Sequence, residues 1–183
     1  MADGTIKLNG ARLNLGCGAK HLPGFVNCDM ANNWCSKEPD VACDVFGRLP
    51  FPDACADEVH AYHVAEHTHR WLIEGVLAEW ARVLKPGGLM VLELPCLDKI
   101  LDIFNQAVER GIAPPTHLTM WGLFGDPKWK NEAMCHRWCY SIAEMSHLMT
   151  QAGLTVEAME AKTHQPIRDM RLEGRKCGSI LAG

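Results

Sequence analysis

The chain has 183 residues, of which 48% are hydrophobic and 22% charged, and its formal net charge is −4 at pH 7. These values are typical of a globular protein, and the length fits one α/β domain. The negative charge argues against general nucleic-acid binding, and no apolar run approaches the roughly 20 residues of a membrane helix. Nine irregularly spaced cysteines and an N-terminus without a signal-peptide pattern predict reduced thiols and a cytoplasmic protein.

Four segments in the first third of the chain are predicted to be strands. They cover residues 11–15, 25–29, 41–45 and 56–62. The residues between Gly18 and Phe25 are too few for a crossover helix, and Pro23 and Gly24 interrupt any helical turn. We therefore expect an open connection between the first two strands.

A helix and a strand are predicted next. Apolar residues recur every three or four positions from Trp71 to Leu84, which indicates an amphipathic helix. Lys85-Pro86-Gly87-Gly88 ends that helix, and residues 89–94 form a dense apolar run typical of a buried strand. A second helix is expected over residues 97–110.

Residues 111–140 mix prolines, tryptophans and basic residues without a regular period. We interpret them as an insertion over the active face of one domain that spans residues 1–183. Ser141 and Glu144 fit a capping box, so a third helix is expected from there to Gly153. Strands are predicted at 154–159 and at 175–181, the latter as an antiparallel edge.

The most informative feature is the pairing of Gly16-Cys17-Gly18 with Asp29. Glycines after a buried strand let the backbone approach a ligand closely. A carboxylate at the end of the next strand can accept hydrogen bonds from both hydroxyls of a ribose. The pair therefore predicts a cofactor that contains a nucleoside.

The order of these segments resembles class I S-adenosylmethionine-dependent methyltransferases, especially small predicted members that open with Leu-Asn-Leu-Gly-Cys-Gly. The motifs that carry the resemblance are 13–18, 23–29, 44–45, 49–53, 56–59, 63–67 and 82–88. Each motif is weak alone, but the ordered set is specific and covers residues 12–95. The resemblance implies a Rossmann-like, doubly wound fold with a mostly parallel seven-stranded sheet, an antiparallel edge strand and three αβα layers.

The resemblance also implies how S-adenosylmethionine would bind. The glycine loop would pass under its methionine part, Asp29 would hold the ribose, and Asp44 with Val45 would flank the adenine. Asn14 stands where many such enzymes have an acidic residue, and Lys20 where a third glycine is common. The full predicted set of cofactor-binding residues is Asn14, Gly16, Cys17, Gly18, Asp29, Met30, Asp44, Val45, Tyr62 and His63.

Methyl transfer to a small-molecule substrate is the predicted reaction. A hydroxyl nucleophile needs a base, and His63 or His67 can accept a proton near pH 7. Glu66 is a third catalytic candidate, although it can instead pair with Arg70.

Three alternatives remain open. A nicotinamide dehydrogenase is disfavoured because His21 replaces the third glycine of its fingerprint. A zinc hydrolase is suggested by the H-x-x-E-H pattern of residues 63–67, with Glu144 as a conceivable third ligand, but this pattern begins at a predicted strand end. A protein that binds S-adenosylmethionine without catalysis is equally compatible with the fold.

Residues 135–139 place His136 between two cysteines, but a second pair of metal ligands is missing, so we interpret them as surface or packing residues. The sequence alone therefore assigns no metal ligands.

Overall fold

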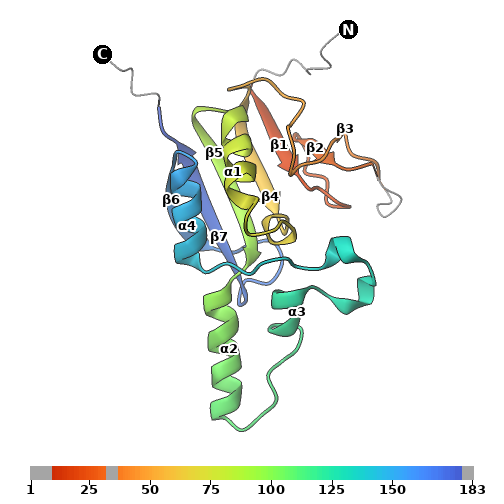
Figure 1. Cartoon of the computed structure of the whole chain (residues 1–183), viewed down its shortest axis with the longest axis vertical. Helices are drawn as coiled ribbons and strands as arrows, with labels where there is room; N and C mark the ends of the chain where they lie inside the picture. Colours follow the sequence, from red (N-terminus) through yellow and green to blue (C-terminus); the bar gives the residue numbers. More distant parts are fainter. Residues whose placement is uncertain (1–9, 32–36, 179–183) are drawn as a thin grey trace.

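The computed structural model describes residues 10–31 and 37–178, and their core is a seven-stranded sheet (Figure 1). The strand order is β3-β2-β1-β4-β5-β7-β6, in which β7 runs antiparallel to both of its neighbours and the other paired strands are parallel. The strands are β1 Ala11–Leu15, β2 Val26–Asp29, β3 Val41–Ala42, β4 Ala56–Tyr62, β5 Leu84–Pro95, β6 Leu154–Glu160 and β7 Asp169–Lys176. This is the mixed, mostly parallel sheet that the sequence predicted.

The predicted strands agree with β1, β2, β4 and β6, whereas the other three differ in length or position. β3 has only two residues, and β5 begins at Leu84, so Lys85 to Gly88 belong to its irregular first part. β7 begins at Asp169 instead of Arg175 and lies between β5 and β6. Residues 179–181 of the predicted strand lie outside the described residues. We missed the start of β7 because its alternating charges resemble a solvated face.

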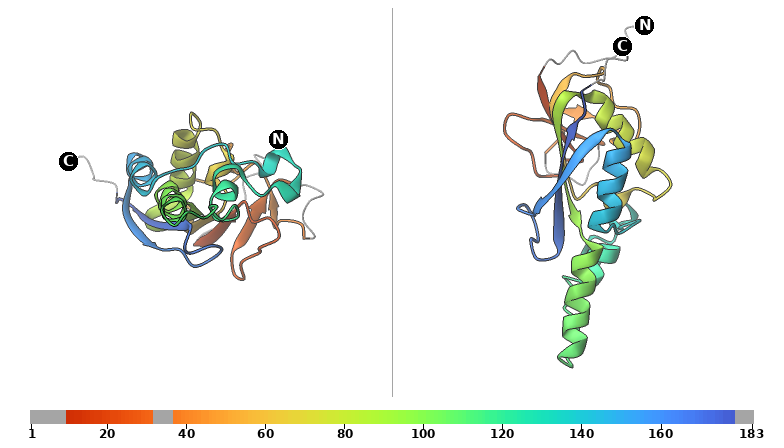
Figure 2. Two further views of the ribbon diagram at one scale, coloured as in Figure 1. Left: turned by 90° about the horizontal axis from the view of Figure 1, so that it is seen from below. Right: turned by 90° about the vertical axis from the view of Figure 1, so that its left-hand side faces the viewer.

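Two helices cover the same face of the sheet (Figure 2). They are α1, Ile73–Val83, and α4, Ile142–Gln151. Leu77 and Trp80 of α1 are completely buried in the core, and the indole Nε1–H of Trp80 donates a hydrogen bond of 2.8 Å to the carbonyl of Val45. Ser141 Oγ accepts a hydrogen bond of 3.1 Å from Glu144 N–H, which confirms the predicted helix cap.

The opposite face carries no helix among the described residues, so the third layer of the expected αβα arrangement is not formed there. The connection from β1 to β2 is a series of turns, as its length predicted. Polar and aromatic side chains contact one another on this face: Arg12 lies 4.7 Å above the Phe25 ring, which lies 4.7 Å from the His60 ring. The connection between β1 and β2 therefore contributes turns but no helix to this face.

Residues 97–140 extend from the end of the sheet at which β4 and β5 finish (Figure 1). They contain α2 Leu97–Glu109, α3 Met120–Phe124 and two 3-10 turns, η2 Pro127–Trp129 and η3 Glu132–Met134. The chain returns to a 3-10 turn that follows β4, η1 Ala65–His67, where Arg137 N–H donates a hydrogen bond of 2.7 Å to the carbonyl of Glu66. None of the helices in the described part of the chain is long and apolar enough to span a membrane.

Candidate functional site

The candidate site lies at the carboxyl edge, which we define as the end of the sheet formed by Leu15, Asp29, Tyr62 and Pro95, the last residues of β1, β2, β4 and β5. In parallel α/β sheets, ligands bind outside the carboxyl ends of the strands. The glycine loop after β1 follows that edge. Gly16 and Gly18 have φ angles of +64° and +48°, values at which a side chain is strained.

The two glycines differ in the space around them. A Cβ atom on Gly16 would lie 2.5 Å from Val64 Cγ2, whereas one on Gly18 would have no atom within 4 Å among the described residues. Gly16 is therefore required by close packing against Val64. Gly18 faces open space, which fits a loop over which a ligand lies.

Asp29 connects the end of β2 to the glycine loop. Its Oδ2 accepts a hydrogen bond of 2.8 Å from Gly18 N–H, and its Oδ1 accepts one of 2.7 Å from Met30 N–H. Each carboxylate oxygen has a second lone pair, so Asp29 can still accept hydrogen bonds from two ribose hydroxyls. Cys17 N–H donates to the carbonyl of Cys28 at 3.1 Å, which fixes the loop between the two predicted contacts.

Asn14 supports this loop from below. Its side chain is 2% exposed, and its amide donates to the carbonyl of Lys20 at 3.0 Å and to Asn27 Oδ1 at 2.9 Å. Asn27 Oδ1 also accepts a hydrogen bond of 2.8 Å from Leu22 N–H. Because both amide hydrogens of Asn14 are used internally, the geometry favours a structural role over the predicted cofactor contact.

Asp44 and Val45 occupy different environments. Asp44 is exposed, and its Oδ1 accepts a hydrogen bond of 2.9 Å from Phe46 N–H. Val45 is buried in the hydrophobic core. Asp44 is therefore open to a ligand, whereas the Val45 side chain supports the site from the core side.

His63 follows β4 and is held between two carboxylates. Its Nδ1 lies 2.9 Å from Glu66 Oε1, and its Nε2 lies 3.0 Å from Asp169 Oδ2. Burial alone lowers the pKa of His63, but the hydrogen bonds to Asp169 and Glu66 outweigh it and raise the pKa to about 9. Burial raises the pKa of Asp169, yet His63 and Arg168 lower it to about 2. The residues thus form a buried ionic cluster.

The positive charge of His63 affects its predicted role as a general base. At pH 7 both ring nitrogens of His63 are protonated and donate to carboxylates, so no lone pair is left to accept a proton. The geometry therefore does not support His63 as a general base. His67 differs, because its Nδ1 lies 3.2 Å from the carbonyl of Cys135 and can donate to it, which leaves the lone pair of the neutral ring on Nε2.

Tyr62 lies on the helix-free face, beside His60. Its hydroxyl is 3.0 Å from His60 Nδ1, and burial raises its pKa. The neutral hydroxyl can therefore serve as a hydrogen-bonding group next to the end of β4.

Sequence reasoning missed the acidic residues that organise this edge from distant segments. Asp169 also accepts hydrogen bonds from Arg168 Nε at 2.7 Å and Gln165 N–H at 3.0 Å. Glu93, at the end of β5, is 1% exposed and accepts hydrogen bonds from Lys162 N–H and Thr163 N–H, both at 2.8 Å. Glu93 is a charged residue within an otherwise apolar run, and this break in the pattern could have marked it as a site residue. The residues around Asp169 in the sequence do not indicate that it pairs with His63.

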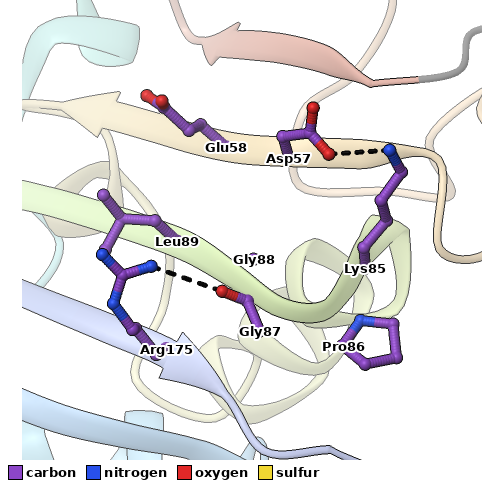
Figure 3. A pocket seen from close by; sticks show the side chains of 8 residues that line it. All are labelled: Asp57, Glu58, Lys85, Pro86, Gly87, Gly88, Leu89 and Arg175. Atoms are coloured by element: carbon purple, nitrogen blue, oxygen red, sulfur yellow. Dashed lines mark hydrogen bonds and ion pairs between the residues drawn. The ribbon is translucent and has the colours of Figure 1, made fainter.

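A hollow of about 350 Å³ lies at the other end of the strands (Figure 3). It is lined by Asp57, Glu58, Lys85, Pro86, Gly87, Gly88, Leu89 and Arg175. Lys85 Nζ is 2.7 Å from Asp57 Oδ1, and Arg175 Nη1 donates to the carbonyl of Gly87 at 3.3 Å. Lys85 and Arg175 therefore already have partners within the hollow. The glycine loop and Asp29 lie at the opposite edge of the sheet, so the hollow is not the predicted cofactor site.

The raised pKa of His63 predicts how stability changes with pH. The stabilisation that protonated His63 gives the folded state is fully present below the pKa of His63 in the unfolded chain, about 6.5. It is lost as the pH rises through about 9, the pKa of His63 in the folded state. We expect the free energy of unfolding to fall across this range by on the order of 3 kcal/mol. Urea denaturation at a series of pH values measures this loss. His63→Gln should give a clearly flatter profile, and an equally steep profile in that variant would assign the loss to other groups.

Comparisons with known proteins bear on the family and the fold. Residues 13–92 match the family described as a methyltransferase domain. No curated protein matches the chain in sequence.

Solved methyltransferases share the fold at low sequence identity. An S-adenosylmethionine-dependent methyltransferase of Thermotoga maritima has a TM-score of 0.59 and 14% identity, covering 92% of this chain and 83% of that one. One of Mesorhizobium loti has a TM-score of 0.60 and 12% identity, covering 93% of both chains. The 1,6-didemethyltoxoflavin-N1-methyltransferase of Burkholderia thailandensis has a TM-score of 0.59 and 15% identity, covering 93% of this chain and 72% of that one. It was solved with bound 1,6-didemethyltoxoflavin and S-adenosylhomocysteine. These likenesses establish a Rossmann-like fold shared with solved methyltransferases, and residues 13–92 carry the match to the methyltransferase-domain family.

Proposed function

We propose that this protein transfers a methyl group from S-adenosylmethionine to a small molecule. The observation that carries the proposal is the junction of Gly18 and Asp29, whose 2.8 Å hydrogen bond brings an open glycine backbone and a carboxylate together at the carboxyl edge. The family match over residues 13–92 supports the same cofactor. A relative solved with S-adenosylhomocysteine supports it further.

The residues of this edge fit the cofactor in distinct ways. Asp29 would accept hydrogen bonds from the ribose hydroxyls with its remaining lone pairs. Gly16, Cys17 and Gly18 would offer backbone to the methionine part, with Met30 and Asp44 at the exposed sides of the nucleoside. When bound, S-adenosylmethionine supplies an electrophilic methyl group that a nucleophile displaces in line.

The protein's main contribution to the rate would be positioning. Holding two reactants at near-attack distance can lower a barrier by roughly 7–11 kcal/mol. Tyr62 and His63, at the end of β4, would border the transferred methyl group, with His63 as a fixed positive charge. Of the predicted bases, His67 keeps a lone pair on Nε2 and would accept a proton from a hydroxyl nucleophile, whereas Glu66 is 1% exposed and already accepts from His63.

Calorimetric titration with S-adenosylhomocysteine tests the proposal. We expect one equivalent to bind, and Asp29→Ala to weaken binding by about 1.5–3 kcal/mol, the range for hydrogen bonds to a charged group. Asp102→Ala is the matched control, because Asp102 is an exposed carboxylate on α2.

Two results would count against the proposal. Unchanged affinity in Asp29→Ala would remove the ribose assignment, and binding of NAD in place of S-adenosylhomocysteine would contradict the methyltransferase function. Binding without any conversion of S-adenosylmethionine across candidate acceptors would favour a non-catalytic binding protein.

A further inference from the structure

Glu66, His67 and His136 meet where the segment after η3 crosses the end of β4. One potential ligand atom from each of the three side chains lies within 4.8 Å of the other two. Backbone hydrogen bonds hold the crossing in place: Arg137 N–H donates to the carbonyl of Glu66 at 2.7 Å, and His136 N–H donates to the carbonyl of Phe124 at 3.3 Å. The cluster is therefore assembled by the fold from segments that are distant in sequence.

The two imidazoles are oriented by backbone carbonyls. His67 Nδ1 lies 3.2 Å from the carbonyl of Cys135, and His136 Nδ1 lies 2.8 Å from the carbonyl of Gly122. A carbonyl oxygen only accepts hydrogen bonds, so Nδ1 is the donor in both rings, and the neutral form of each ring has its lone pair on Nε2. Burial lowers the pKa of His136, which favours its neutral form. Histidines that bind metals are held in the same way, with the second nitrogen donating to a carbonyl or carboxylate.

Glu66 supplies an independent indication of a missing ligand. Its side chain is 1% exposed, Oε1 accepts from His63, and Oε2 is buried with no hydrogen-bond partner among the described residues. Burial raises the pKa of Glu66, but the neighbouring His63 outweighs it and lowers the pKa, so the carboxylate is ionised. Buried charged oxygens are normally paired or bound to a cation.

We propose that Glu66, His67 and His136 bind one divalent transition-metal ion. Two imidazole nitrogens and one carboxylate oxygen form the donor set of zinc sites that keep a fourth position open, and of mononuclear iron(II) sites. Zinc–nitrogen bonds of about 2.0–2.1 Å require the three side chains to draw closer together. His67 and His136 are only half-buried, whereas Glu66 is fully buried.

The proposed ligands differ from those of the zinc-hydrolase alternative. His63 of the H-x-x-E-H pattern is excluded because both of its nitrogens are paired with carboxylates. Glu144, the suggested third ligand, lies 2.8 Å from Arg70 Nε instead. The open position would bind an oxygen or nitrogen atom of a small molecule. The lone pair of His67 would then bind the ion and would no longer act as a base.

Cobalt(II) is a suitable probe, because its visible absorption reports the number and geometry of its ligands. After removal of metals with EDTA, we expect the wild-type protein to bind one equivalent of Co²⁺ and to lose the absorption when Zn²⁺ is added. His67→Ala and His136→Ala should each weaken Co²⁺ binding by at least about 100-fold. Two matched controls should leave it unchanged: His147→Ala, at an exposed position on α4, and His164→Ala, beside His63 and Asp169.

Circular dichroism and thermal unfolding of the metal-free variants check that each is folded, and Zn²⁺ should raise the melting temperature of the wild type and both controls only. If either ligand variant does not fold, His67→Gln and His136→Gln replace it. Failure of the wild type to bind Co²⁺ or Zn²⁺ would overturn the site, as would binding that survives both ligand substitutions or is lost in His164→Ala. These readouts do not involve S-adenosylmethionine, so their outcome is independent of cofactor binding and methyl transfer; it bears only on whether His67 is free to act as the base.

Discussion

Replacing Asp169 with alanine is expected to lower the free energy of unfolding by about 3–5 kcal/mol, the usual cost of removing one partner from a buried ion pair. Asp169 is completely buried and accepts hydrogen bonds from His63, Arg168 and Gln165. Without the carboxylate, the buried guanidinium of Arg168 loses its acidic partner, and His63 keeps Glu66 alone. The loss should therefore exceed that of an ordinary polar deletion.

Chemical denaturation at pH 7 measures this change, with Asp102→Ala as the matched control for loss of an exposed carboxylate. The control should remain within about 0.5 kcal/mol of the wild type. A loss below about 1 kcal/mol in Asp169→Ala would show that the cluster does not contribute to stability. Asp169→Asn should recover part of the loss, because an amide oxygen can still accept a hydrogen bond from Arg168 or Gln165.

The second large effect is expected at Gly16. Gly16→Ala would place a Cβ atom 2.5 Å from Val64 Cγ2 at a φ angle of +64°, so both the packing and the backbone conformation oppose it. We expect a loss of about 2–4 kcal/mol, the sum of a strained backbone and an overpacked contact.

Gly18→Ala is the matched control, since it has a similar φ angle of +48° but no described atom within 4 Å of the added Cβ. It should lose only about 1 kcal/mol, the part that comes from the backbone alone. Thermal and urea unfolding of both variants measure the difference. Equal losses would show that the contact with Val64 does not constrain the loop.

The sequence predicted the parts of the fold that depend on local patterns. Alternating polar and apolar residues, or continuous apolar runs, predicted β1, β2, β4 and β6. These patterns are present in the strand's own residues because a strand is buried on one or both faces. Ser141 with Glu144 marked the start of α4 for a similar reason, since a helix cap is formed by neighbours in the chain. The position predicted for β7 was wrong, which shows the limit of local patterns. The outward side chains of β7 are charged, and the strand β5 with which it pairs is distant in sequence.

The candidate site divides in the same way. Gly16, Gly18 and Asp29 could be predicted because a loop after one strand and a carboxylate after the next must meet at one edge of a parallel sheet. The partners of His63 and His67 could not, because Asp169 and His136 come from segments whose positions depend on the whole fold. As a result, the sequence assigned His63 a base role that its ionic partners do not support.

Hydrogen exchange with and without S-adenosylhomocysteine is the most direct test of the central claim that the glycine loop and Asp29 bind the cofactor. We predict slower exchange on ligand addition in residues 14–18 and 28–30, with no change in residues 84–89 at the hollow of the opposite edge. Protection confined to residues 84–89, or no protection at a saturating concentration of ligand, would contradict the account.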